Sequence, residues 1–234
     1  MGMTNNLTYE RTGSIGVITM DDGKANCLSS HMLRDLNQAL DQASTDKATV
    51  LLTGRPQRFS GGFDLAALKQ GGAPARDMLH AGFELAERLL AFPLPVVAAC
   101  NGHALAMGSF LLLSADVRIG AAGAFKIGAN EVAIGMTMPH TAVEICRYRL
   151  APTHLTRAVI CAEIYDPERA VEAGFLDRVV PEAELLAAAA AAATALSALN
   201  LAALAATKLR VRHGFLTAMR EAIETDRIDM QARY

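Results

Sequence analysis

Several patterns that mark common classes of protein are missing from this chain. It contains no tryptophan, its net charge is −2, and no part of the sequence forms a basic stripe. Nucleic acid is therefore not expected as a partner. No P-loop, GxSxG or HExxH motif occurs, and the six histidines are not spaced as metal ligands. The sequence thus predicts no metal site.

Cysteine pairs and targeting signals are missing as well. The four cysteines form neither a CxxC pair nor a Cys/His cluster with zinc spacing. Unpaired cysteines in apolar surroundings indicate a reducing compartment, so we expect a cytoplasmic protein. Residues 1–13 contain no apolar stretch, and no signal peptide is expected.

One uncharged segment, residues 185–207, is long enough to raise the alternative of a transmembrane helix. Alanine, its main component, drives membrane insertion only weakly, and Ser197 and Asn200 interrupt the run. Alanine is also the best helix former. We therefore expect no membrane partner, but helices that pack on the core or on a neighbouring subunit.

What is present is the composition of a globular protein with a substantial core: 234 residues, 52% of them hydrophobic. Short apolar runs alternate with helical spacing in the first half, and the chain becomes entirely helical from about residue 182. Strands are expected over 14–20, 48–54, 95–102 and 115–121. Helices are expected after Ser29 or Ser30 and over 76–92 and 104–114. This alternation predicts an α/β core with sites in the loops that follow strands.

Two glycine-containing turns stand where a strand passes into a helix. The first is "FSGGFD", residues 59–64, and the second lies in "NGHALAMGS", residues 101–109. Glycine lets a ligand approach the backbone, and the first turn of a helix has free N–H donors. Two such turns could direct N–H groups at one oxygen. For either turn alone, an ordinary packing role explains the glycines equally well.

A third loop, "GANEVAIGMTMP", places Glu131 in apolar surroundings between Gly128 and Gly135. A buried carboxylate there would have a raised pKa, which suits a general base. A solvent-exposed glutamate is the alternative. His103 and His140 lie close to the candidate loops and are further candidates for the site.

Four motifs in this order resemble the crotonase (enoyl-CoA hydratase/isomerase) superfamily, and the resemblance runs from about Tyr9 to the C-terminus. They are "FSGGFDL", "NGHALAMGSFLLLSADVRI", "GANEVAIGMTMP" and "PERAVEAGFLDRVVP". The resemblance implies a spiral of repeated ββα units over 1–181, which holds the active site, and a C-terminal helical oligomerisation region over 182–234. It also implies an acyl-CoA substrate, no separate cofactor, and a homotrimer or a dimer of trimers.

The resemblance also implies an oxyanion hole. Its two backbone N–H donors would belong to Phe63 and Met107. Many members have glycine at the second of these positions. The large side chains in this chain would stand near the entrance of the acyl pocket. "GKANCL", residues 23–28, is similar to the family's loop along coenzyme A. The substrate-binding residues expected from these motifs are Lys24, Ala25, Ser60, Gly61, Gly62, Asp64, Leu65, Gly108, Phe110 and Pro139.

The side chains in these motifs favour one reaction of the superfamily. Typical hydratases of the superfamily use two glutamates. In this chain the position of the first glutamate holds Phe110, and the position of the second holds Glu131. A single carboxylate suits the shift of a double bond from the 3- to the 2-position, and the third motif looks most like the Δ3,Δ2-enoyl-CoA isomerase branch. Alternatives are a hydratase in which Glu144 supplies the second carboxylate, another crotonase-type lyase or hydrolase, and a non-catalytic acyl-CoA-binding or scaffold subunit.

Overall fold

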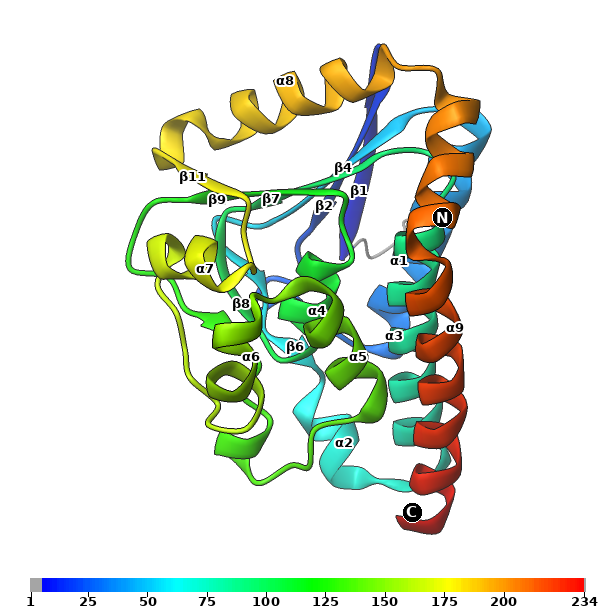
Figure 1. Cartoon of the computed structure of the whole chain (residues 1–234), viewed down its shortest axis with the longest axis vertical. Coiled ribbons are helices and arrows are strands. Elements are labelled where there is room, and N and C mark those ends of the chain that lie inside the picture. The colour runs from blue at the N-terminus through cyan, green and yellow to red at the C-terminus, as the bar shows by residue number, and fades with distance from the viewer. Residues whose placement is uncertain (1–5, 234) are drawn as a thin grey trace.

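A computed structural model describes residues 6–233 and is built around one six-stranded sheet (Figure 1). The strands lie in the order β1 (Leu7–Thr12), β2 (Ile15–Met20), β4 (Thr49–Gly54), β7 (Val96–Cys100), β9 (Val117–Ala121) and β11 (Arg178–Val180). Only the β1–β2 pair is antiparallel. The central strands β4 and β7 are buried on both faces, which explains why they read as continuous apolar runs.

Short second strands follow the strands of the main sheet and form two smaller sheets. One has the order β10 (Ile127–Gly128), β8 (Gly102–Leu105) and β5 (Gln57–Ser60), and the other pairs β3 (Cys27–Leu28) with β6 (Gly62–Phe63). Each turn of the chain therefore contributes a long strand, a short strand and then a helix. This repetition is the predicted spiral of ββα units, and the predicted fold class is confirmed.

The helices cover the small sheets and both faces of the main sheet. They are α1 (Ser30–Asp46), α2 (Leu65–Gln70), α3 (Gly72–Ala91), α4 (Met107–Leu113), α5 (His140–Arg149), α6 (Pro152–Val159), α7 (Pro167–Ala173), α8 (Leu185–Ser197) and α9 (Leu201–Arg233), with short 3-10 turns η1 (Val132–Ile134) and η2 (Glu182–Glu184).

The first helix follows its sequence pattern closely. Ser29 is its N-cap, and the Ser29 hydroxyl accepts a hydrogen bond from Met32 N. Leu33, Leu36 and Leu40 are buried on one face at helical spacing. Burying each such side chain contributes about 1.5–3 kcal/mol to folding.

The expected helix over 104–114 begins three residues later than predicted, at Met107. The preceding residues form β8, whose backbone groups pair with β5 on one side and β10 on the other. Long-range strand pairing thus overrides the local apolar pattern at Ala104 and Leu105. The strand expected over 95–102 accordingly ends at Cys100 in the main sheet, and Gly102 begins β8 in a smaller sheet.

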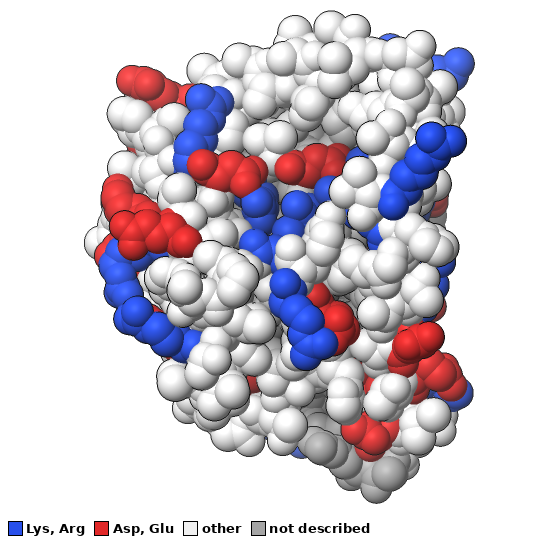
Figure 2. All heavy atoms as spheres, viewed as in Figure 1, with Lys and Arg blue, Asp and Glu red and all other residues white. Residues whose placement is uncertain are grey.

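The two C-terminal helices pack on different parts of the same chain (Figure 1). The buried alanines of α8, Ala189 and Ala193, lie against Val97 and Ile119 of the main sheet, where a small side chain allows close approach. Helix α9 runs along α3 and contacts α5. In Figure 2, the surface over α8 at the top of the view consists of uncharged side chains. The division into regions 1–181 and 182–234 stays a prediction.

Among residues 6–233, no single helix has the length and apolar character needed to cross a membrane. Helices α8 and α9 meet that requirement only as a pair, and they are bent by 100° where they join.

Candidate active site

The three loops singled out in the sequence meet at one place. A Cβ added to Gly62 would lie 2.9 Å from the Ala106 Cβ and 3.2 Å from Met107 N, so the two glycine turns are in direct contact. Ala106 N donates a hydrogen bond to the carbonyl of Gly128, at 3.0 Å. Glu131 follows Gly128 by three residues, which span at most about 10 Å. The predicted donors and the predicted base therefore share one region of the fold.

The first turn is fastened to the loop that holds Lys24 and Ala25. Gly61 N donates to the Ala25 carbonyl, and the Ser60 hydroxyl donates to the Asn26 carbonyl, both at 2.8 Å. Asn26 is buried and adopts a positive φ of 51°, and its side-chain amide donates to the carbonyls of β2 and β5. Ser60, expected to bind substrate, is thus buried with its hydroxyl engaged between loops.

The residues after this turn have separate structural roles. Asp64 is the N-cap of α2, and its carboxylate accepts hydrogen bonds from Ala66 N and Ala67 N. Leu65 is half exposed. The ring of Phe63 packs edge-on against Phe83, with centroids 5.9 Å apart.

The second turn contains strained backbone that the sequence did not reveal. Ala106, the residue before α4, adopts φ 49° and ψ −130°, a region that non-glycine residues rarely occupy. This conformation sets the direction of the next amide, that of Met107. A Cβ on Gly108 would lie 2.3 Å from the Ser60 carbonyl, so glycine is required there for the turns to touch. Phe110, one turn further on, is 1% exposed.

The expectation that the side chains of Phe63 and Met107 stand at an entrance is wrong. Both side chains are buried, and both point toward Gly82 of α3. A Cβ added to Gly82 would lie 2.4 Å from the Phe63 ring and 3.7 Å from the Met107 Cε. Gly82 makes room for these larger side chains. Only the packing of α3 on the turns identifies its role.

Glu131 is buried, with 5% of its surface exposed, so the alternative of an exposed glutamate is wrong. Its Oε2 atom has no hydrogen-bond partner among residues 6–233. Burial raises the pKa of the Glu131 carboxyl from 4.5 to about 7, and a backbone hydrogen bond partly opposes this shift. A carboxyl group with this pKa can both accept and donate a proton near neutral pH.

The far end of the Glu131 loop is anchored by α9. Pro139 is the N-cap position of α5, and the next two amides, of His140 and Thr141, donate to the buried carboxylate of Asp226 at 2.8 Å. The His140 side chain is exposed and pairs with Asp229. Glu144 forms an ion pair with Arg147 at 2.9 Å. No local pattern marks Asp226, because it lies 85 residues from Thr141 in the sequence.

A cavity of about 380 Å³ adjoins the first turn. Ala25 and Gly61, both expected to bind substrate, line it together with Leu105. Its remaining lining residues, Arg58, His103 and Lys126, are all basic. His103 was expected as a candidate for the site, whereas Arg58 and Lys126 were not. The signal that could have found them is the strand register, because Arg58 pairs with His103 across β5 and β8.

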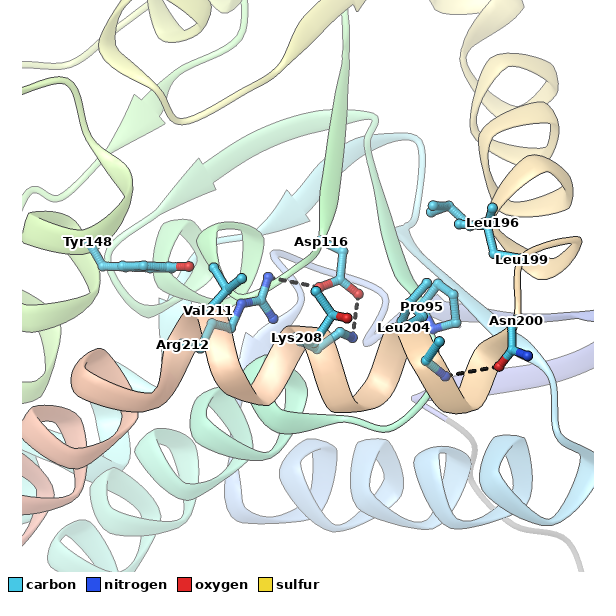
Figure 3. Close-up of a pocket in the computed structure, with 12 residues that line it drawn as sticks. Pro95, Asp116, Tyr148, Leu196, Leu199, Asn200, Leu204, Lys208, Val211 and Arg212 are labelled. Atoms are coloured by element: carbon cyan, nitrogen blue, oxygen red, sulfur yellow. Dashed lines mark hydrogen bonds and ion pairs between the residues drawn. The ribbon is translucent and has the colours of Figure 1, made fainter.

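A larger cavity, of about 520 Å³, lies beneath the junction of α8 and α9 (Figure 3). Its wall is mainly apolar, and its single carboxylate is paired with both of its cations. Asp116 accepts from Lys208 Nζ at 2.6 Å and from Arg212 Nη2 at 2.8 Å. Lys208 also donates to the carbonyls of Phe92 and Leu94. None of the predicted site residues lines this cavity.

Within residues 6–233, no group of three or more His, Cys, Asp or Glu side chains is arranged to hold a metal ion. The arrangement at the loops is instead suited to proton transfer. Backbone N–H groups at the start of α4 have no partner within their own helix. The carboxyl of Glu131, whose pKa is raised, lies on the loop that follows β10.

Known proteins resemble this chain over nearly its full length. The family model described as Enoyl-CoA hydratase/isomerase matches residues 10–233. A solved structure of a probable enoyl-CoA hydratase from Mycobacterium tuberculosis is 48% identical, with a TM-score of 0.91 and 94% of both chains covered. A second solved structure of this same Mycobacterium tuberculosis protein, where it is named an enoyl-CoA isomerase, is 46% identical, with a TM-score of 0.92, and covers 99% of this chain and 100% of the other.

A curated relative, a carnitinyl-CoA dehydratase from Shigella flexneri, is 31% identical over 79% of this chain and 71% of its own length. The names of these relatives differ in the reaction but share the acyl-CoA thioester. The fold, the three converging loops and the matched family model lead to one assignment. The chain belongs to the enoyl-CoA hydratase/isomerase family.

Proposed function

We propose that this enzyme of the enoyl-CoA hydratase/isomerase family moves the double bond of a 3-enoyl-CoA to the 2-position. The observation that carries the proposal is the buried Glu131, whose pKa is raised to about 7, on the loop hydrogen-bonded to the second glycine turn. The relative from Mycobacterium tuberculosis is named an enoyl-CoA isomerase in one structure and a probable enoyl-CoA hydratase in another, so the choice rests on the side chains of this chain.

The proposed reaction is a proton shuttle. The thioester carbonyl accepts hydrogen bonds from Phe63 N and Met107 N. The Glu131 carboxylate removes a proton from C2, and the electron pair passes to the thioester oxygen as an enolate. The N–H donors stabilise this charge. The Glu131 carboxyl then returns the proton to C4, so that C3=C4 becomes C2=C3 and no atom is gained or lost.

Phe110 favours isomerisation over hydration. It occupies the position at which typical hydratases carry their other glutamate, and its ring is buried. A phenyl ring cannot orient or activate water, whereas it helps to keep the pocket dry. Glu144, the alternative second carboxylate, is held in an ion pair with Arg147. A single acid/base residue is sufficient for the shuttle.

A paired assay with 3-hexenoyl-CoA and crotonyl-CoA tests the proposal. We expect conjugation of the first substrate and little hydration of the second. Glu131→Gln should lower the isomerase rate at least about 100-fold, as is usual when a positioned proton-transfer group is removed. Because the carboxylate must be ionised to accept the C2 proton, kcat/KM should rise with pH through about 7 and then level off.

Glu144→Gln is the matched control and should leave the isomerase rate within about twofold of the unmodified enzyme, since Glu144 takes no part in the proposed shuttle and pairs with the exposed Arg147. Robust hydration of crotonyl-CoA that is lost in Glu144→Gln would overturn the proposal in favour of a hydratase. Absence of any binding to acetyl-CoA in a calorimetric titration would instead favour a scaffold subunit.

The remaining expectations concern the setting of the enzyme. We propose a homotrimer or a dimer of trimers, because Leu199, between α8 and α9, and Val211 of α9 are both more than half exposed beside the larger cavity. Light scattering after size-exclusion chromatography tests this. We also propose a cytoplasmic enzyme that needs no cofactor beyond the coenzyme A of its substrate.

A further inference from the structure

Asp226 is a buried carboxylate of α9 that has no cationic partner among residues 6–233. It is 4% exposed, and none of the ion pairs in the described part of the chain includes it. It accepts instead three hydrogen bonds from the start of α5: from His140 N and Thr141 N, both at 2.8 Å, and from the Thr141 hydroxyl at 2.7 Å. The first amides of a helix have no partner within their own helix, and a helix N-terminus favours a negative charge. Asp226 therefore caps α5 from a distant part of the chain.

The loop that carries Glu131 runs directly into this capped end of α5. Met136 N donates to the Glu131 carbonyl at 2.9 Å, so residues 131–136 form one closed turn. Only residues 137–139 separate this turn from the helix, and three residues span at most about 10 Å. A displacement of the start of α5 is therefore passed on to Glu131.

Few other polar contacts hold this loop. In the part of the chain that the structure describes, the hydrogen bonds of residues 130–139 stay within the loop or reach α5. A pocket of about 130 Å³ also separates the loop from its neighbours. The pocket is lined by side chains of the loop, of α3 and of α9, among them Met136, Met138, Leu79 and Met230. The loop is therefore not closely packed on α9 at this place, and the hydrogen bonds to Asp226 join the two.

Helix α5 in turn lies close to both halves of the site. Burial and, to a smaller extent, the charge of Glu131 raise the pKa of the Cys146 thiol, which belongs to α5. Helix α5 also contacts α4, the helix that begins at Met107. The other titratable side chains at the pocket are His140 of α5 and Asp226 and Asp229 of α9, and α3 lines it with the uncharged Leu79. The position of α5 thus decides how well Glu131 is shielded from water.

We propose that Asp226 is a positioning residue of the proton shuttle, which caps α5 and thereby holds the Glu131 carboxyl in a dry place beside the oxyanion donors. The inference rests on the proposed function, which makes Glu131 the acid/base group. Without the cap, the first turn of α5 would be free to move, and water would reach Glu131 from the pocket. The pKa of Glu131, which burial raises to about 7, would then fall toward 4.5. The carboxylate would become a weaker and less well-placed base.

The variant Asp226→Asn tests the proposal with two readouts. In the assay with 3-hexenoyl-CoA, kcat should fall at least about tenfold with KM within about twofold, because a misplaced base affects the chemical step more than binding. The rise of kcat/KM with pH should move to lower pH by at least about half a unit. A residue that only stabilised the fold would lower Tm without moving this rise.

The second readout needs no activity. In an NMR titration of protein that carries isotope-labelled glutamate, the carboxyl signal absent from Glu131→Gln belongs to Glu131. This signal should titrate at lower pH in Asp226→Asn than in the unmodified chain.

Thr141 offers a matched pair of variants, which decides the question if Asp226→Asn does not fold. Thr141→Val removes the hydroxyl that donates to Asp226 but keeps both amides. It should lower kcat by about threefold and shift the Glu131 titration in the same direction. Thr141→Ser keeps the hydroxyl and should restore both readouts. Equal behaviour of the two variants would contradict the proposal.

The control for charge is Asp229→Asn, which removes a carboxylate about one turn further along α9. Asp229 is half exposed and pairs with the His140 side chain at 3.6 Å. Both readouts should match those of the unmodified chain. Unchanged kcat and an unchanged Glu131 titration in folded Asp226→Asn overturn this inference alone, and so does an equal shift in Asp229→Asn. If the unmodified chain does not convert 3-hexenoyl-CoA, the proposed function fails, and the NMR titration still decides whether Asp226 positions the carboxyl.

Discussion

The candidate site has two halves that are held in different ways. The donor half consists of the turns at Gly62–Phe63 and Ala106–Met107, and the base half is the loop from Asn130 to Pro139, which carries Glu131. In the donor half, backbone is fixed against backbone: Gly61 N donates to Ala25 O, Ala106 N donates to Gly128 O, and a Cβ added to Gly62 would lie only 3.2 Å from Met107 N.

The base half depends on one side chain in a more exposed loop. Val132 and Ile134, the neighbours of Glu131 in η1, are each 46% exposed, and an anchor of the loop is Asp226 at its far end. The difference is instructive because the donor half accepts large side chains, as Phe63 and Met107 demonstrate, but not a change of backbone. The base half should accept small backbone changes but not a change of chemistry.

The strongest test of this difference is Gly62→Ala. Its Cβ would lie 2.9 Å from the Ala106 Cβ, and the backbone there has φ +91°, so both turns must move. Misplacing one donor should lower kcat by about 10²–10³-fold. Gly13→Ala is the control, because Gly13 also has a positive φ, +61°, but nothing lies within 4 Å of an added Cβ. If Gly62→Ala kept full activity, the donor half would not depend on backbone contact.

A second test concerns the stability of the base half. Burial raises the pKa of Glu131 from 4.5 to about 7, so the folded state binds a proton that the unfolded state has released between these pH values. The contribution of the protonated Glu131 carboxyl to the free energy of unfolding is therefore complete below about pH 4.5 and is lost as the pH rises through about 7.

The side-chain amide of glutamine does not ionise in this pH range. Glu131→Gln should therefore raise the free energy of unfolding at pH 8 by about 3 kcal/mol relative to the unmodified chain, and the gain should shrink toward pH 4.5. Urea unfolding at several pH values measures it. A gain independent of pH would mean that the buried charge is not its cause.

The anchor of the base half should have a smaller effect. Asp226→Asn leaves one acceptor oxygen where two oxygens now bind His140 N, Thr141 N and the Thr141 hydroxyl. Loss of this cap should cost about 1–2 kcal/mol in the free energy of unfolding, measured by urea. Asp229→Asn, at a half-exposed neighbouring carboxylate, is the control and should change stability by less than about 0.5 kcal/mol. Equal losses in both variants would contradict the capping role.

The smallest effect is expected from Ala106→Gly in the donor half. Glycine adopts φ 49° and ψ −130° without strain, but it gains freedom in the unfolded chain. The net change should be a stabilisation of about 1 kcal/mol or less, measured as a shift in Tm, with kcat within about twofold. Ala162→Gly, at another positive φ, is the control for strain outside the two glycine turns. A large fall in kcat with unchanged Tm would show that the strained alanine itself orients Met107 N.

Much of this architecture can be predicted because local patterns decide it. The helical spacing of Leu33, Leu36 and Leu40 after a serine cap and the apolar run of β4 led to the correct elements. The start of α4 was missed because β8 is defined by partners from other turns of the spiral.

The candidate site divides in the same manner. The glycine turns and Glu131 are recognisable as motifs, since their residues are close in sequence. Arg58 and Lys126 belong to no motif, and they meet His103 only through the order of the strands. Gly82 looks like any glycine in a helix until Phe63 packs against it.

By itself, the sequence determined which groups are available: the flexible glycines beside Phe63 and Met107, a phenylalanine at position 110, and one carboxylate in an apolar loop. The tertiary structure alone decided that the turns touch, that Ala106 is strained and that the carboxyl of Glu131 loses its contact with water. The reason is that a pKa depends on desolvation, and desolvation is produced by residues from many parts of the chain, which no local pattern records.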